Sequence, residues 1–114
     1  MRWTLVAFLA MMGGAAAAPP APPQSKPHHC AREAVTQAEK LLRFHFGEDD
    51  QISIDSAATV LPSIRNPAAP PQRFDVLEVW GYIYKGRYRM HLIYARMPDQ
   101  CVLVGQEILE YARL

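Results

Sequence analysis

The sequence of 114 residues lacks the features by which several large classes of protein are recognised. It has no basic excess, because 12 Lys and Arg residues stand against 11 Asp and Glu residues, whereas proteins that hold nucleic acid electrostatically are strongly basic. Its 2 cysteines and 4 histidines form no array with the spacing of a structural zinc site. No Gly-rich loop is present that would cradle a phosphate. The sequence therefore predicts no nucleic-acid partner, no metal centre and no nucleotide cofactor.

A long apolar run is lacking as well, which bears on the first segment of the chain. The apolar run at residues 5–12 covers about eight residues, whereas a helix that spans a bilayer needs about 20. Arg2 precedes this run and alanines follow it at residues 15–18, which is the pattern of a secretory signal peptide. We therefore expect a signal peptide over residues 1–17, cleaved after Ala17, no membrane span, and a location that is secreted or periplasmic.

The two cysteines, Cys30 and Cys101, are predicted to form one disulfide, because an even pair in an oxidising compartment is most simply a bridge. The loop that this bridge closes is long, and chain entropy would stabilise the fold by roughly 4 kcal/mol. Metal binding by the consecutive residues His28, His29 and Cys30 is the alternative. The disulfide is preferred, since adjacent side chains rarely converge on one ion and an oxidised cysteine offers no thiolate.

Composition divides the remaining chain into a linker and one domain. Residues 18–29 are rich in proline, which forms neither helix interiors nor central strands, and they are predicted to be an extended linker. Residues 30–114 are expected to form a single domain. Its first element is an amphipathic helix of about 16 residues that begins after Cys30 and is followed by Gly47 as its C-cap.

Strand patterns fill the rest of the domain. Apolar and polar residues alternate over 51–61, with a bulge expected at Ser56-Ala57, and the proline-rich residues 62–72 are expected to be irregular. Residues 73–96 alternate on both sides of Lys85-Gly86 and predict a β-hairpin whose two-residue turn lies there. A last strand is expected over 101–111.

This order of elements predicts an α+β domain in which one N-terminal amphipathic helix packs on a four-stranded antiparallel sheet. Over residues 30–114 the order resembles the cystatin-like architecture, in which a sheet wraps around one long helix. The resemblance is one of topology. The Gln-x-Val-x-Gly hairpin of the cystatin inhibitors is not found, and Gly81, the nearest match, falls within a strand. Protease inhibition is therefore not carried over to this chain.

The turn at Lys85-Gly86 sets the register of the hairpin and so assigns each side chain to one of two faces. One face is almost entirely apolar and is expected to lie against the helix. The other is expected to carry aromatic and basic residues in cross-strand pairs: Tyr84 with Arg87, Tyr82 with Arg89, and Trp80 with His91. If Cys101 faces the helix, the residues of the last strand alternate from there. Leu103 and Gly105 then point inward, and Val102, Val104 and Gln106 point outward.

Tyr, Trp and Arg side chains gathered on one exposed face have the composition of protein–protein interfaces. We therefore expect a small exported protein-binding domain, without a cofactor and not an enzyme, whose partner is another exported protein or a second copy. An inhibitor or an immunity-type protein is one specific form of this expectation. The expected contact residues are Trp80, Tyr82, Tyr84, Arg87, Arg89 and His91.

Three alternatives involve the same face. In the first, the aromatic–arginine pairs only stabilise an open sheet, or the proline-rich residues 62–72 or the N-terminal linker fold over the face. A structural homodimer would use the face for self-association. A small-ligand carrier or enzyme of the NTF2-like type would use Glu78 and His91 as an acid–base pair, which requires a concave and partly dry site.

Overall fold

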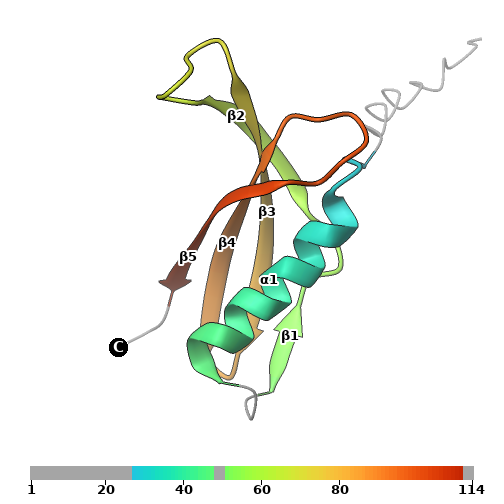
Figure 1. The fold of residues 1–114 in the computed structure, drawn as a ribbon. Coiled ribbons are helices and arrows are strands. Elements are labelled where there is room, and N and C mark those ends of the chain that lie inside the picture. The colour runs from blue at the N-terminus through green and yellow to red at the C-terminus, as the bar shows by residue number, and fades with distance from the viewer. Residues whose placement is uncertain (1–26, 48–50, 112–114) are drawn as a thin grey trace, which may run out of the picture.

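The computed structural model describes residues 27–47 and 51–111, which form one helix and five strands (Figure 1). The predicted signal peptide and most of the predicted linker lie outside these residues. Among the described residues, no helix is long and apolar enough to cross a membrane. Helix α1 spans Ala31–Phe46, and the strands are β1 (Ile52–Ile54), β2 (Thr59–Arg65), β3 (Arg73–Ile83), β4 (Gly86–Ala95) and β5 (Leu103–Tyr111).

Helix α1 has the 16 residues that its amphipathic pattern predicts. The small residues Ala34 and Ala38 are fully buried, as is Leu42 one turn later, so the helix lies close to the sheet. Gly47 follows the helix with a φ of 95°, a conformation that favours glycine. Its N–H donates to the carbonyl oxygen of Arg43 at 2.7 Å and closes the last turn.

The strands form one antiparallel sheet in the order β1-β3-β4-β5, and β2 pairs with the same edge of β3 as β1 does. β1 lies beside residues 81–83 of β3 and β2 beside residues 73–78, so these two short strands follow one another along that edge. The predicted α+β fold is therefore confirmed, with five strands rather than four. The N–H of Asp55 still donates to the carbonyl oxygen of Trp80 at 2.9 Å, but residues 56–58 leave the ladder and so divide the predicted strand over 51–61.

The proline-rich connection is shorter than predicted. β2 continues through Pro62 to Arg65, and the irregular loop covers only residues 66–72. An edge strand tolerates proline because its open side needs no N–H donor. The register of β2 on β3 shifts between Leu61 and Ile64, around this proline.

The hairpin turn lies at Tyr84-Lys85, not at Lys85-Gly86. Ile83 pairs with Gly86, and Tyr84 takes the positive φ of 54° that the turn requires. Every cross-strand pair is therefore displaced by two residues from the predicted register. Because side chains alternate with a period of two, the displacement leaves each residue of β3 and β4 on the face to which the sequence assigned it.

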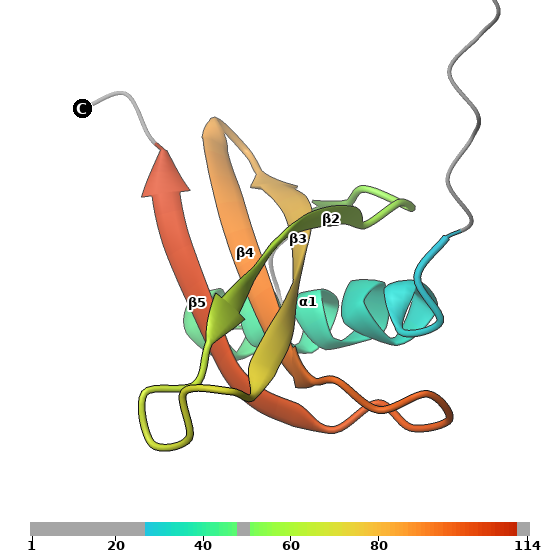
Figure 2. The same cartoon turned by 90° about the horizontal axis from the view of Figure 1, so that it is seen from above.

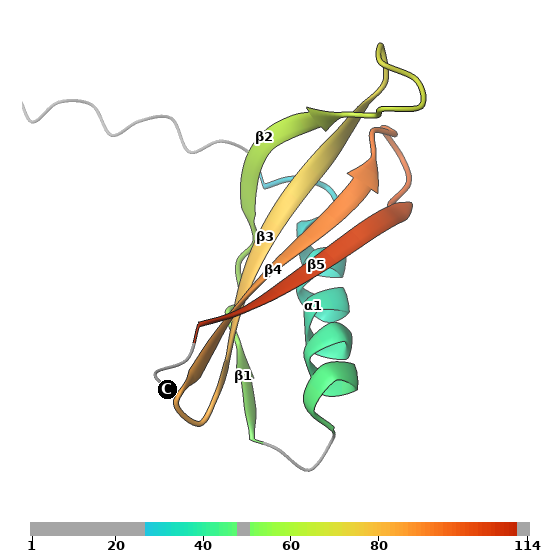
Figure 3. The ribbon, with the colours of Figure 1, turned by 90° about the vertical axis from the view of Figure 1, so that its left-hand side faces the viewer.

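Helix α1 covers one face of the sheet, as the side views show (Figures 2 and 3). The largest fully buried side chains gather between the two layers: Tyr94, Leu42, Leu77, Met90, Leu92 and Val79. The predicted disulfide joins Cys30, at the start of α1, to Cys101, just before β5, with 5.6 Å between the Cα atoms. It ties the helix to the turn that leads into the last strand.

Gly81 allows the helix to approach β3 closely. A Cβ atom at this position would lie 2.7 Å from Cδ2 of Leu42 and 3.0 Å from the ends of Ile54 and Met90. The helix itself is thus the nearest neighbour of Gly81, through Leu42.

Candidate protein-interaction face

The outer face is the face of the sheet that points away from α1, and its side chains form ordered rows. Leu77 and Val79 of β3 are buried against the helix, so the residues that alternate with them point outward. The register aligns these residues across β3, β4 and β5 in three rows: Tyr82 with Arg87 and Tyr111, Trp80 with Arg89 and Leu109, and Glu78 with His91 and Glu107.

Two arginines of the outer face lie over aromatic rings. The guanidinium carbon of Arg87 is 4.8 Å from the centroid of the Trp80 ring, and that of Arg89 is 5.8 Å from the Tyr111 ring. The two rings are themselves 5.7 Å apart. Neither arginine has a carboxylate partner among the described residues. These cation–π contacts favour one position for each guanidinium group, and its N–H edges meet no carboxylate in the part of the chain that the structure describes.

A polar cluster lies in the third row. Glu78 uses both carboxylate oxygens: one accepts the indole N–H of Trp80 at 3.0 Å, and the other lies 2.8 Å from Nε2 of His91. On its other side, Nδ1 of His91 lies 3.6 Å from Glu107. Glu78 and His91 are mostly buried, with side chains 17% and 18% exposed. The sequence placed Glu78 diagonal to His91, and the true register makes them direct neighbours.

This cluster orders the sheet rather than offering a reactive group. Since Glu78 can only accept, Nε2 of His91 serves as the donor to it, and the remaining ring nitrogen faces a second carboxylate. The contacts of Glu78 also fix the ring of Trp80. A groove of about 730 Å³ lies between the start of α1 and the β1–β2 connection, and no residue of this cluster lines it.

The predicted contact residues are not all brought together. Trp80, Tyr82, Arg87 and Arg89 share adjacent rows of the outer face, and His91 belongs to the polar cluster beside them. Tyr84 does not belong to this surface. It lies in the turn, 94% exposed, with Lys85 over its ring at 5.9 Å.

The last strand presents other residues than the sequence predicted. The register of β5 on β4 shifts between Leu103 and Gly105, which reverses the alternation for every residue that follows. Gln106 therefore faces the helix, where its side-chain oxygen accepts a hydrogen bond from Gln37 at 3.1 Å, and Gly105 points outward. Leu109 and Tyr111, which sequence reasoning did not assign to the face, join it and are 47% and 44% exposed. No sequence pattern around residues 103–105 predicts this shift of register.

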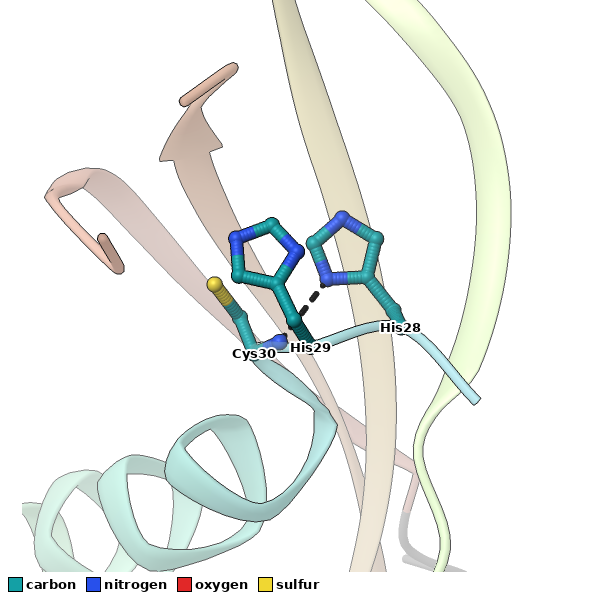
Figure 4. A group of neighbouring side chains, drawn as sticks. All are labelled: His28, His29 and Cys30. Atoms are coloured by element: carbon teal, nitrogen blue, oxygen red, sulfur yellow. Dashed lines mark hydrogen bonds between the residues drawn. The ribbon is translucent and has the colours of Figure 1, made fainter. Parts of the chain in front are cut away.

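A second cluster lies at the start of α1, where ring nitrogens of His28 and His29 and the sulfur of Cys30 are within 4.8 Å of one another (Figure 4). The sulfur is bonded to Cys101 and offers no thiolate. Nδ1 of His28 accepts the backbone N–H of Cys30 at 3.0 Å, and its Nε2 lies 3.0 Å from Asp75. With the sulfur oxidised and both ring nitrogens of His28 already in contact with protein atoms, the group does not offer the three ligands of a metal centre.

The contacts of His28 and His29 instead attach the start of the helix to the sheet. Asp75 on β3 receives both His28 and Arg96, the latter at 2.9 Å. Burial alone would raise the pKa of the Asp75 carboxyl, but the hydrogen bonds and positive charge of His28 and Arg96 hold that pKa below its usual value. His29 lies 3.1 Å from the carbonyl oxygen of Gln100. Both histidines of the predicted linker are thus in contact with the domain.

Comparison of the chain with models of protein families, with curated proteins and with solved structures finds no match.

Proposed function

We propose that this chain is an exported protein-binding domain whose contact surface is the outer face. The observation that carries the proposal is the pair of arginines stacked on Trp80 and Tyr111, with no carboxylate partner among the described residues. Arginine and aromatic side chains held in fixed positions are the groups that contribute most to the affinity of protein interfaces, because little side-chain entropy remains to be lost on binding.

The surroundings of these residues support the same function. Exposed apolar side chains of β5 extend the outer face to the edge of the sheet, where Leu109 and Tyr111 are nearly half exposed. The disulfide suits an oxidising compartment, and together with the signal-peptide pattern it supports export, either to the periplasm or out of the cell. A small, cross-linked domain with a rigid contact face is suited to the role of an inhibitor or an immunity-type protein.

The test compares variants of the exported chain as bait for cross-linking to other exported proteins. Trp80→Ala and Arg89→Glu each remove one anchor from the outer face, and both are expected to weaken capture of the partner at least tenfold. Phe44→Ala is the matched control, since this aromatic residue is 90% exposed on the helix. Equal capture by all three variants would contradict the proposal, provided that their circular dichroism spectra agree.

Self-association through the outer face is distinguished by the mass in solution. The proposal expects a monomer by light scattering for both the wild-type chain and Arg89→Glu. A wild-type dimer that becomes a monomer on Arg89→Glu would assign the outer face to a homodimer instead.

A further inference from the structure

Strand β5 forms one edge of the sheet and is open along its whole length. It pairs with β4 on one side, and no strand of the described residues pairs with its other side. Its nine residues therefore present a row of backbone N–H and C=O groups that a further strand can bind. Figure 2 shows β5 at the side of the sheet, beyond β4.

The opposite edge of the sheet is protected against the addition of a further strand. It is divided between β1 and β2 by residues 55–58, it contains Pro62, and its register shifts around that proline. Breaks, prolines and bulges are the devices by which proteins prevent edge strands from pairing. The irregularity of β5 is confined to its first residues, 103–105, and the strand that follows contains neither proline nor a basic residue, with Leu109 and Tyr111 exposed. The two edges thus differ in the property that decides whether a strand can be added.

The charges of β5 indicate what kind of strand would bind. Its charged residues are Glu107 and Glu110, both acidic and both exposed. A second copy paired along this edge would bring four carboxylates together without one cation from either strand, which disfavours self-pairing. Glu107 points to the outer face and Glu110 to the helix side, because they are three residues apart in the strand.

We propose that β5 binds an extended segment of another protein by strand addition, and that this segment carries two basic residues three positions apart with apolar residues between them. Paired antiparallel with β5, the basic side chains lie opposite Glu107 and Glu110, and the apolar ones lie opposite Ile108 and Leu109. This inference rests on the proposed protein-binding function and identifies the chemistry of the partner. The arginines and aromatic residues of the outer face then contact the part of the partner protein that continues past the added strand.

The probe is a synthetic peptide, acetyl-Thr-Lys-Val-Ile-Lys-Thr-Val-amide, titrated into the exported full chain and followed by backbone NMR. We expect the largest shift changes at the amides of β5, with none along β1 and β2. A peptide of the same composition with its lysines two positions apart is the matched control, because it places both charges on one face. We expect it to bind about fivefold more weakly.

Variants of the chain test the charge pairing. The double variant Glu107→Gln with Glu110→Gln should weaken binding of the first peptide about fivefold, whereas Glu39→Gln, on the exposed surface of α1, should leave it unchanged. The reversal Glu107→Lys with Glu110→Lys should bind the same peptide with glutamates in place of lysines. The inference is overturned by equal binding of the two lysine spacings, by an equal effect of Glu39→Gln, by shift changes confined to the other edge, or by the absence of binding.

The two proposals fail separately. If the peptide does not bind while capture of a partner still depends on Trp80 and Arg89, strand addition is wrong and the outer face stands. If the peptide binds while Trp80→Ala and Arg89→Glu leave capture unchanged, the outer face is not the contact surface. A doubling of mass that Glu107→Lys with Glu110→Lys abolishes would show that a second copy occupies β5, and would overturn the inference.

Discussion

Loss of the disulfide is expected to lower the free energy of unfolding by about 4.4 kcal/mol. The bridge joins residues separated by 71 positions. The chain-entropy relation assigns a loop of this length about 15 cal/mol/K of entropy removed from the unfolded state, which is about 4.4 kcal/mol at 25 °C. A domain of this size is typically stable by only about 4–12 kcal/mol, so reduction should remove a large part of its stability.

The assay is urea unfolding of the exported chain, followed by circular dichroism with and without a reductant. The reduced wild-type chain reports the cross-link alone, because both thiols remain in place. The variant Cys30→Ala with Cys101→Ala adds the loss of packing at Cys30, which is fully buried. We therefore expect the reduced wild-type chain to unfold at lower urea than the oxidised one, and the double variant at lower urea still.

One result would refute the reasoning. If reduction lowers the free energy of unfolding by less than about 1 kcal/mol while the double variant loses several, the bridge acts through packing and not through the entropy of the unfolded chain. The slope of the transition provides a control, because an unfolded chain without the cross-link exposes more surface and should show a steeper dependence on urea.

Three further predictions concern single residues and are measured by the same unfolding assay. Gly81→Ala should destabilise the fold by about 1–3 kcal/mol, because its Cβ would lie 2.7 Å from Leu42 and force the helix or the side chain to move; an unchanged midpoint would contradict the close approach. Tyr94→Phe should stabilise the fold by about 1 kcal/mol, because the hydroxyl of this fully buried tyrosine has no hydrogen-bond partner among the described residues. Burial, with the charge of Glu33 nearby, raises the pKa of Tyr94 to about 12. The wild-type chain should therefore also lose stability as the pH rises above about 10, and the variant should lose less. Asp75→Asn should reduce the loss of stability in acid. The pKa of the Asp75 carboxyl in the folded chain lies below its unfolded value of 3.8, so the carboxylate stabilises the fold above pH 3.8 and ceases to do so as the pH falls through the folded pKa. An equal loss of the free energy of unfolding in acid for the two proteins would contradict this prediction.

The elements and the faces of the sheet follow from the sequence because both depend on periodicity. The 3.6-residue period of α1 and the alternation in β3 and β4 are long enough to be read without knowing where each turn lies. The error of two residues at the hairpin did no harm to the face assignment, since two is the period of the strand. It did misplace Tyr84, because a tyrosine with positive φ is rare and Gly86 offered the more obvious turn.

The arrangement of the sheet edges could not be predicted in the same way. The irregularity between Leu103 and Gly105 adds one residue to the strand, and a single inserted residue reverses every later side chain. The division of the first predicted strand likewise depends on how its residues meet β3, which is a tertiary property. The faces were therefore correctly predicted on β3, on β4 and at Leu103, and wrongly on β5 from Gly105 onward, where Leu109 and Tyr111 were missed.

The disulfide also has a mechanical consequence. It closes a covalent ring from Cys30 to Cys101 that contains α1 and strands β1 to β4, while β5 lies outside the ring. A force applied between the two ends of the chain passes from Cys30 to Cys101 across the sulfur bridge, so the covalent chain between these two residues cannot be extended by it. Such a force peels β5 from β4 and stops at Cys101. The strand with the open edge is thus the one part of the sheet that can be withdrawn while the covalent ring stays closed around the core.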